Sequence, residues 1–122
     1  MTHLVVGELC ADIVVTLDGD PDAEIEFGQA ERLVPATEVV MGSSSAITAC
    51  GLARLDVPTA LVSVVGDDLL GGFLLGELRD RRVDTTNVRV DGSLPTGTST
   101  ILTRPDGDRA ILTALARSVR SP

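Results

Sequence analysis

The stretch TALVSVVGDDLLGGFLLGEL, residues 59–78, changes from one periodicity to another at Gly66. Residues 59–65 form a run of almost entirely apolar and β-branched side chains, which is typical of a buried strand. After Gly66, Asp67 or Asp68 can cap a helix, because a short acidic side chain accepts hydrogen bonds from the first free N–H groups. The apolar residues of that helix recur at helical spacing: Leu70, Phe73, Leu74 and Leu78. A strand followed directly by a helix is half of a βαβ unit.

The same alternation extends to both sides of this stretch. Residues 3–7 (HLVVG) form a short apolar run closed by glycine, which predicts a buried strand. Residues 42–45 (GSSS) offer serine caps to a second helix, and residues 87–90 (NVRV) predict a further short strand. The apolar positions of the second helix share one stripe: Ala46, Ile47, Ala49, Cys50, Ala53 and Leu55. This order of elements predicts an α/β fold with a parallel sheet.

The C-terminal part of the sequence has a different character. Residues 97–103 (GTSTILT) and 109–113 (RAILT) predict two short strands around a PDGD turn, and such a hairpin has one polar and one apolar face. Residues 11–17 and 31–41 are also β-branched runs that predict strands, with Pro35 marking an edge or a bend in the second.

Charge and composition exclude several classes of protein. The chain has 122 residues, a net charge of −8 and only 2% aromatic residues. Nucleic acid is therefore not an expected partner, because its binding needs clustered cations and stacking aromatics. All ten cations are arginine, and the absence of lysine excludes a P-loop. No stretch reaches the roughly 18 apolar residues of a membrane span, and no signal peptide is recognisable, so we expect one cytoplasmic domain without membrane contact.

The metal-ligating residues are few. Cys10, Cys50 and the single His3 do not suffice for a structural zinc site. We expect both cysteines to be free thiols in a reducing cytoplasm rather than a disulfide. Three aspartates at alternate positions in residues 18–22 imitate the start of an EF-hand loop, but its glycine and its final glutamate are missing. No metal site is predicted, and this acidic segment should be a solvated turn.

Three segments at the ends of predicted strands are candidate binding sites. Asp12 lies in an otherwise apolar run, where a carboxylate is costly unless it accepts hydrogen bonds. It either holds ligand hydroxyls or lies in a turn or at a sheet edge. Residues 42–45 either offer N–H groups and hydroxyls to a polar ligand or only cap a helix, and residues 66–68 present the same alternatives. Strand ends are where α/β folds bind ligands.

Taken in order, these segments resemble the ribokinase-like (PfkB-type) carbohydrate kinase family. The family's opening pattern of a strand, a glycine and a sugar-binding aspartate is similar to Val5-Val6-Gly7 followed by Asp12. Further similar segments are GSSSAI (42–47), ARL (53–55), VVGDD (64–68), EL (77–78), VDT (83–85) and PTG (95–97). The resemblance covers residues 5–113. It implies a ribokinase-like, Rossmann-like three-layer α/β fold, of which this chain holds an incomplete part: the N-terminal part of the parallel sheet, its flanking helices and a small β lid.

The resemblance also implies an acceptor site for a sugar or a nucleoside. Asp12 would hold the acceptor hydroxyls, and Gly42 and Ser43 would supply backbone and hydroxyl contacts. Three positions depart from the family pattern. Ser43 replaces the second signature glycine, Ile47 replaces an asparagine that contacts the sugar, and Asp56 replaces a glycine. An isoleucine cannot donate a hydrogen bond to a hydroxyl, so that contact is lost here.

The predicted lid completes the substrate contacts. By resemblance, Ser99 and Ile101 on one lid strand would face the sugar ring, and Arg109 on the following strand is a further candidate. We therefore expect residues 1–113 to be the acceptor-binding and lid portion of such a kinase. Residues 114–122 should form an unstructured or non-homologous tail.

The implied activity is ATP-dependent phosphorylation of a sugar or nucleoside hydroxyl. The family carries its catalytic aspartate, its Gly-Ala-Gly anion hole and its ATP pocket in a C-terminal half, and no comparable stretch exists in this sequence. The complete enzyme would need ATP and Mg²⁺, but we expect neither to bind this chain. Since phosphoryl transfer depends on positioning and charge stabilisation, we expect the chain alone to be inactive, with no catalytic residue of its own.

Three interpretations remain at this point. The chain is either part of such a kinase or a non-catalytic module, produced by truncation or a frame-shift, that binds a partner or itself through unpaired sheet edges. A homodimer that forms through the lid is one form of this second interpretation. The other alternative is an unrelated α/β ligand-binding domain.

Overall fold

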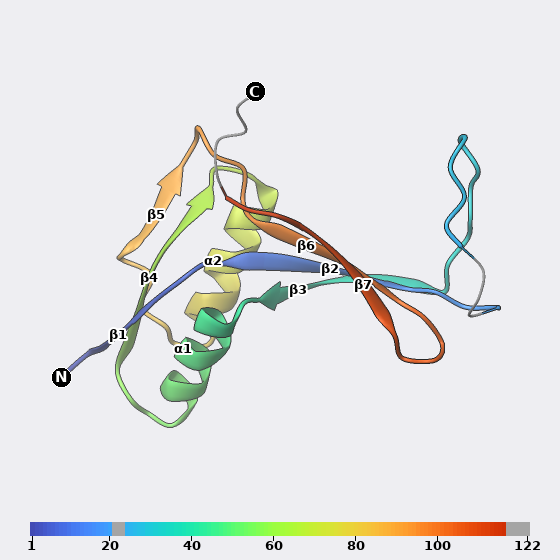
Figure 1. The fold of residues 1–122 in the computed structure, drawn as a ribbon. Coiled ribbons are helices and arrows are strands. Elements are labelled where there is room, and N and C mark those ends of the chain that lie inside the picture. Colours follow the sequence, from blue (N-terminus) through green and yellow to red (C-terminus); the bar gives the residue numbers. More distant parts are fainter. Residues whose placement is uncertain (21–23, 117–122) are drawn as a thin grey trace.

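The computed structural model describes residues 1–20 and 24–116. Within these residues the chain forms two sheets and two helices, and one sheet extends away from the helices as an arm (Figure 1). The elements are β1 (His3–Val6), β2 (Cys10–Thr16), β3 (Ala36–Gly42), α1 (Ser44–Arg54), β4 (Thr59–Gly66), α2 (Leu69–Asp80), β5 (Val88–Asp91), β6 (Thr98–Thr103) and β7 (Arg109–Ala114).

The body of the molecule contains the predicted parallel sheet. Its strand order is β1-β4-β5, and both neighbouring pairs are parallel. Val5 is paired with Leu61, and Val65 with Val90. Each parallel pair needs a crossover, which α1 supplies between β1 and β4 and α2 supplies between β4 and β5. The βαβ prediction is confirmed.

Both helices pack on the same face of this sheet. Leu61 and Val65 point from β4 toward the helices and are fully buried, as are Leu74 and Leu78 of α2. The stripe that α1 buries consists of alanines: Ala46, Ala49 and Ala53. Small side chains let α1 approach the sheet closely, while the leucines of α2 fill the remaining volume, each contributing about 1.5–3 kcal/mol through burial.

Two expectations about burial are wrong. β1 is an edge strand rather than a buried strand, and Leu4 and Val6 are 63% and 74% exposed. The reason is that both helices lie on one face, so alternate side chains of β1 on the other face have no neighbour. In α1, Ile47 and Leu55 are 68% and 75% exposed, because only the narrow alanine stripe meets the sheet.

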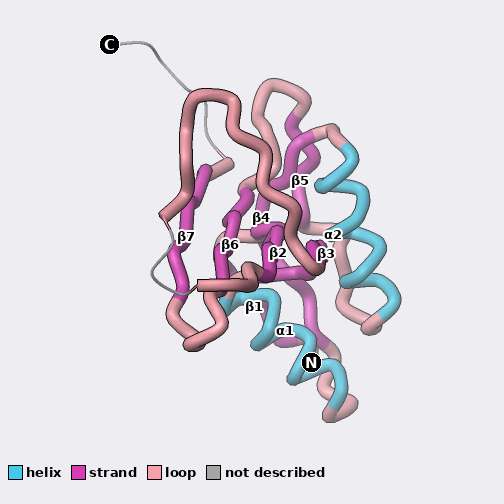
Figure 2. Tube along the Cα trace, turned by 90° about the vertical axis from the view of Figure 1, so that its right-hand side faces the viewer, coloured by secondary structure: helices cyan, strands magenta, loops and turns pink. Residues whose placement is uncertain are grey.

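The second sheet contains the strands of the predicted lid, and we call this sheet the lid. Its strand order is β3-β2-β6-β7, and it is mixed, since β2 is antiparallel to β3 and parallel to β6 (Figure 2). The predicted hairpin is confirmed as β6 and β7, with Ile101 paired with Ile111. The two strands predicted from residues 11–17 and 31–41 are β2 and β3, and they complete this sheet. Ala11 and Met41 connect the lid to the core of the body.

The predicted tail falls largely outside the described residues. Ala114 still belongs to β7, whereas residues 117–122 are outside the described ranges, as is Asp22 of the acidic segment. Among the helices that the structure describes, none combines the length and the apolar character that a membrane crossing requires.

Candidate functional site

A half-open cavity of about 830 Å³ lies between the lid and the edge of the parallel sheet. Its walls come from the end of β1 and the loop after it, the middle of β4, and the lid strands β2, β6 and β7. Much of the lining is aliphatic, with Val6, Val62, Val64, Ile101 and Ile111 among its members. Its polar side chains are Glu8, Cys10, Asp12, Ser43, Ser63, Ser99, Arg109 and Thr113. An apolar cleft with a few convergent polar groups is the usual form of a small-molecule site.

Asp12 lies in a central strand of the lid, neither in a turn nor at a sheet edge. It is paired across β2 and β6 with Ser99, whose hydroxyl is 2.9 Å from the hydroxyl of Thr113 on β7. The thiol of Cys10 is 3.7 Å from Oδ1 of Asp12 and 3.5 Å from Oγ of Ser99. The start of the lid therefore presents a row of polar groups to the cavity, and the Asp12 carboxylate has acceptor capacity left for a ligand.

Gly42 contributes space rather than a contact with the cavity. It is buried, and a Cβ atom built on it would overlap the carboxylate of Asp12. The carboxylate therefore lies directly against the Gly42 backbone at the end of β3. Any larger residue at position 42 would push Asp12 out of its position.

Ser43 caps α1 in an unusual conformation. Its backbone has φ 88° and ψ 145°, a region that essentially only glycine occupies without strain. Its Oγ accepts a hydrogen bond from the N–H of Ala46 at 3.3 Å and lies 3.2 Å from Oγ of Ser45. Ser45 in turn donates to the carbonyl of Glu8, which joins the start of α1 to the loop after β1. The Ser43 hydroxyl thus accepts the hydrogen bond that caps α1, and Ser43 also lines the cavity.

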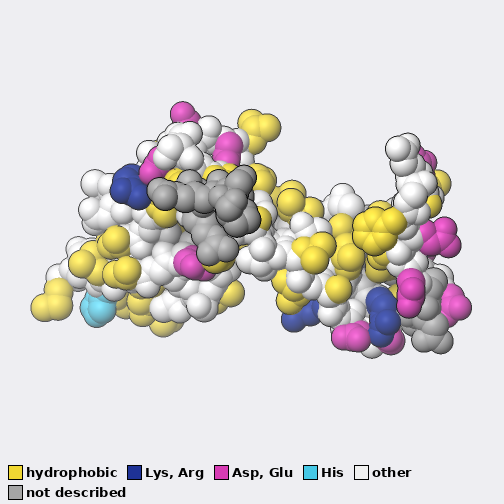
Figure 3. Space-filling model, turned by 45° about the horizontal axis from the view of Figure 1, so that its top comes forward, with side chains coloured by type: hydrophobic (Ala, Val, Ile, Leu, Met, Phe, Trp, Pro, Cys, Tyr) yellow, Lys and Arg dark blue, Asp and Glu magenta, His cyan; other side chains and the backbone are white. Residues whose placement is uncertain are grey.

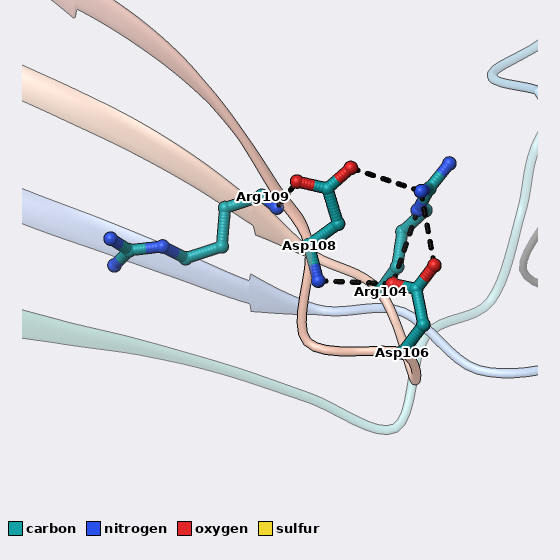
Figure 4. Close-up of polar contacts among 4 residues, drawn as sticks. All are labelled: Arg104, Asp106, Asp108 and Arg109. Atoms are coloured by element: carbon teal, nitrogen blue, oxygen red, sulfur yellow. Dashed lines mark hydrogen bonds and ion pairs between the residues drawn. The ribbon is translucent and has the colours of Figure 1, made fainter.

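Ile101 and Arg109 lie on the lid face that looks into the cavity. Ile101 is 9% exposed, and its pairing with Ile111 forms an aliphatic patch across β6 and β7. Arg109 donates its backbone N–H to Asp108, but within the described part of the chain no acceptor pairs with its guanidinium. Figure 4 shows this guanidinium lying away from the turn, whereas that of Arg104 lies between Asp106 and Asp108.

Cys10 and Ser63 line the cavity without having been predicted from the sequence. Burial raises the pKa of the Cys10 thiol; the hydrogen bond with Ser99 lowers it by less, and the nearby carboxylate of Asp12 raises it further. Cys10 is therefore a protonated thiol at neutral pH, and both cysteines are free, as expected. Ser63 carries a buried hydroxyl without a partner in the described structure. Only the spacing of Cys10, two residues before Asp12 on one strand face, could have indicated its place.

The described residues bring most of the predicted site together. Asp12, Ser43, Ser99, Ile101 and Arg109 all line the one cavity, and Gly42 supports Asp12 from behind. The exposed Ile47 is not part of the lining. Among residues 1–20 and 24–116, no three His, Cys, Asp or Glu side chains gather closely enough to hold a metal ion.

Comparison with known proteins identifies the family of the chain. The sequence model of the pfkB family carbohydrate kinases matches residues 2–119. The chain belongs to this family. Among curated members it is 33% identical over 106 residues to a probable fructokinase-7 of Arabidopsis thaliana, which covers 87% of this chain and 28% of that protein. It is also 33% identical over 91 residues to 5-dehydro-2-deoxygluconokinase 1 of Bacillus cereus (strain ZK / E33L), covering 72% of this chain and 24% of that kinase.

Solved structures of PfkB-type kinases confirm the ribokinase-like fold. The Arabidopsis thaliana ribokinase complexed with ribose and ATP aligns with a TM-score of 0.79 and 25% identity, over 91% of this chain and 35% of that one. The nucleoside kinase of Methanocaldococcus jannaschii aligns with a TM-score of 0.77 at 18% identity, over 93% of this chain and 36% of that one. The chain thus spans about a quarter of its curated relatives and about a third of these structures.

Proposed function

We propose that this chain forms the acceptor-binding part of an ATP-dependent carbohydrate kinase that phosphorylates a sugar hydroxyl. The observation that carries the proposal is the convergence of Asp12, Ser99 and Ile101 on one cavity beside the start of α1. A carboxylate in a partly apolar cleft binds neighbouring hydroxyls strongly, because hydrogen bonds to a charged acceptor exceed those between neutral groups. An aliphatic lid face covers the non-polar side of a sugar and excludes water.

Each residue has a distinct part in this proposal. Asp12 accepts hydrogen bonds from two acceptor hydroxyls, and Gly42 lets its carboxylate lie close to the backbone of β3. Ser99 and Thr113 extend the polar row so that the sugar is held in one orientation. Ser43 offers its hydroxyl near the positive end of α1, where the helix dipole favours oxygen-rich ligands. Ile101 covers the ring from the lid.

The described residues do not fit a nucleoside triphosphate with its metal ion. The cavity carries the carboxylates of Glu8 and Asp12 and a single cation, Arg109, so it would repel a triphosphate more than it would hold one. Its lining has no aspartate cluster for Mg²⁺ among the described residues. When bound to the complete kinase, ATP supplies the phosphoryl group. In our proposal this chain holds and orients the hydroxyl that receives it, and residues outside the chain bind the donor.

The proposal is tested by mapping where sugars bind. The chain labelled with ¹⁵N should show amide shifts on titration with ribose or fructose, concentrated at β2, β6 and the start of α1. Titration with ATP and Mg²⁺ should not change the chemical shifts of these amides. Asp12→Ala should abolish the sugar-induced shifts, whereas Asp67→Ala, which removes an exposed aspartate outside the cavity, should preserve them. Sugar-induced shifts that scatter over the surface, or that persist in Asp12→Ala, would contradict the proposal.

A second candidate function is self-association, and exposed apolar side chains favour it. Leu4 and Val6 are uncovered on the free face of the parallel sheet, and Ile111 and Leu112 of the outer lid strand β7 are 54% and 65% exposed. Figure 3 shows hydrophobic side chains spread over the middle and the left of this face, with charged side chains on both the left-hand and the right-hand part of the molecule. A homodimer through the lid would cover the β7 edge. Sedimentation velocity at several protein concentrations distinguishes a self-associating chain from a monomeric acceptor-binding unit.

A further inference from the structure

We propose that Cys10 is a positioning residue of the acceptor site: its thiol holds one oxygen of the Asp12 carboxylate and leaves the other oxygen free for acceptor hydroxyls. The inference rests on the proposed function, since it assumes that Asp12 binds an acceptor. It adds a residue that acts through Asp12 rather than on the acceptor itself.

The place of Cys10 in the lid carries the inference. Side chains alternate along a strand, so Cys10 and Asp12 lie on the same face of β2, and both line the cavity. The sulfur has three acceptors within reach: Oδ1 of Asp12 at 3.7 Å, the carbonyl of Ala11 at 3.7 Å and Oγ of Ser99 at 3.5 Å. Only the carboxylate is charged, and hydrogen bonds to a charged acceptor are the stronger ones. The single thiol hydrogen therefore goes to Oδ1 of Asp12.

The neighbouring hydroxyls complete a chain of donors that ends at Asp12. With the thiol hydrogen on Asp12, the hydroxyl of Ser99 donates to the sulfur of Cys10. The hydroxyl of Thr113, 2.9 Å from that of Ser99, donates to Ser99 in turn. Burial raises the pKa of the Cys10 thiol; the bond with Ser99 lowers it, as a donor to the sulfur does, and the bond with Asp12 raises it, as an acceptor of the thiol hydrogen does. Each bond of such a chain polarises the next and strengthens it.

This chain determines which part of Asp12 is left for an acceptor. Within residues 1–20 and 24–116, the Cys10 thiol is the one donor to the Asp12 carboxylate, and it reaches Oδ1. Asp12 is half-buried, and the Gly42 backbone lies directly against its carboxylate. The carboxylate is thus held before an acceptor arrives, and Oδ2 keeps its full capacity to accept from hydroxyls. A group that is already ordered loses less conformational freedom on binding, so the acceptor is bound more tightly.

The thiol can hold Asp12 only while it is protonated. A thiolate has no hydrogen to donate, and it would place a second negative charge beside the Asp12 carboxylate. The charged side chains of the described lining are Glu8 in the loop after β1, Asp12 on the same strand as Cys10, and Arg109 further along the lid on β7. The two that act on the Cys10 thiol, Asp12 and Glu8, are both negative. Acceptor binding should therefore weaken in alkaline solution.

The composition of the chain isolates this alkaline effect. The chain has no tyrosine, and all ten of its cations are arginine. Between about pH 8.5 and pH 10.5 the two thiols are therefore the only side chains that are expected to titrate. Cys50 lies in α1 and does not line the cavity. Cys50→Ser removes the second thiol without altering the site, and it is the matched control.

Calorimetric titration with ribose tests the inference, with circular dichroism to check the fold. At pH 7.5, Cys10→Ala should bind ribose about threefold to tenfold more weakly than the unmodified chain, because it lacks the donor. Cys10→Ser keeps a donor and should stay within about twofold. Raising the pH to 10.5 should weaken binding by the unmodified chain and by Cys50→Ser about threefold or more, and should leave Cys10→Ser unchanged.

A second measurement follows the thiol itself. The ultraviolet absorbance of the thiolate gives the pKa of Cys10 in the Cys50→Ser chain. Saturating ribose should raise this pKa, because a site that binds ribose better with a protonated thiol must also hold the thiol proton better with ribose bound. A residue that only supported the fold would show no such change.

The outcomes separate this inference from the proposed function. Ribose binding that requires Asp12 but is unchanged in Cys10→Ala would overturn the role of Cys10 and leave acceptor binding intact. An alkaline loss of affinity that persists in Cys10→Ser would also overturn it, because another group would then cause the loss. If Cys10→Ala does not fold, the thiol titration decides, and a pKa that ribose leaves unchanged overturns the inference. Failure of the unmodified chain to bind ribose would contradict both proposals.

Discussion

The hydroxyl of Thr96 donates a 2.5 Å hydrogen bond to Oδ1 of Asp68 and accepts one of 2.9 Å from the N–H of Gly66. The other carboxylate oxygen of Asp68 accepts from the N–H of Thr96 at 3.0 Å, and Oδ1 also caps α2 through the N–H of Gly71. These two residues join the end of β4, the start of α2 and the segment that enters β6. They therefore fix the lid on the body, and with it the cavity.

The first prediction concerns the stability that this junction provides. Asp68→Ala should lower the free energy of unfolding by about 2 kcal/mol at pH 7, because it removes a helix cap and leaves the buried Thr96 hydroxyl short of an acceptor. Urea denaturation followed by circular dichroism measures this loss. The neighbouring Asp67→Ala should stay within about 0.5 kcal/mol of the unmodified chain. Equal effects of the two substitutions would show that the junction contributes little.

The second prediction follows from the ionisation of Asp68. Burial raises its pKa, but hydrogen bonds from the Thr96 hydroxyl, the Thr96 N–H and the Gly71 N–H outweigh this, so the pKa is lowered from the ordinary value of 3.8. The unfolded chain then binds the proton more readily than the folded one. The resulting stability is present above pH 3.8 and is lost as the pH falls through the lowered pKa.

Urea unfolding between pH 6 and pH 2.5 tests this pH dependence. The loss of stability should be smaller in Asp68→Asn than in the unmodified chain. Asp68→Asn should still lose some stability in acid, because hydrogen bonds from Thr86 and Ser93 also lower the pKa values of Asp84 and Asp91. Parallel curves for the two proteins over the acidic range would argue against a lowered pKa at Asp68.

The third prediction concerns the two positions where the family pattern has glycine. Ser43 has φ 88° with an extended ψ, whereas Asp56 has φ 61°, in the left-handed region that aspartate tolerates. Ser43→Gly should raise the free energy of unfolding by about 1 kcal/mol, since relief of strain exceeds the lost cap and the added chain entropy. Asp56→Gly should leave the free energy of unfolding nearly unchanged, because the smaller relief of backbone strain is offset by loss of the ion pair with Arg82. A destabilised Ser43→Gly would mean that the serine cap dominates the strain.

The fourth prediction uses the contact between Gly42 and Asp12. Gly42→Ala should weaken sugar binding at least about tenfold, because the new methyl group displaces the carboxylate that binds the hydroxyls. The control is Gly51→Ala in α1, where a Cβ meets nothing within 4 Å and alanine should stabilise the helix by about 0.5–1 kcal/mol. Calorimetric titration with a sugar measures both. Unchanged affinity in Gly42→Ala, with the fold intact, would remove Asp12 from the binding site.

The body of the fold could be predicted from the sequence because its signals are local. The change of period at Gly66 and the Asp68 cap locate β4 and α2 without knowledge of any distant residue. The lid sheet could not be predicted as a unit. The lid forms because β2 pairs with β6, and these two strands are far apart in the sequence. The local sequence pattern of a strand does not indicate which other strand it pairs with. For the same reason, the exposure of Leu4 and Val6 was missed.

The candidate site was predictable where it depends on residue type along one strand. Asp12 is unusual in an apolar run, and the family resemblance indicated Ser43, Ser99, Ile101 and Arg109 on segments that the fold then brings to one cavity. Cys10 was missed because a cysteine in an apolar strand is ordinarily a small core residue. Its contact with Ser99 arises only when β2 pairs with β6.

The most direct test of the account is the dissociation constant of the chain for ribose or fructose, compared between the unmodified protein and Asp12→Asn by calorimetric titration. Asparagine keeps the shape of the side chain and removes its charge. We predict affinity weaker by a factor of about 10 to 100 in Asp12→Asn, with an unchanged constant in Asp67→Asn. Equal constants for Asp12→Asn and the unmodified chain would show that this carboxylate does not bind the acceptor.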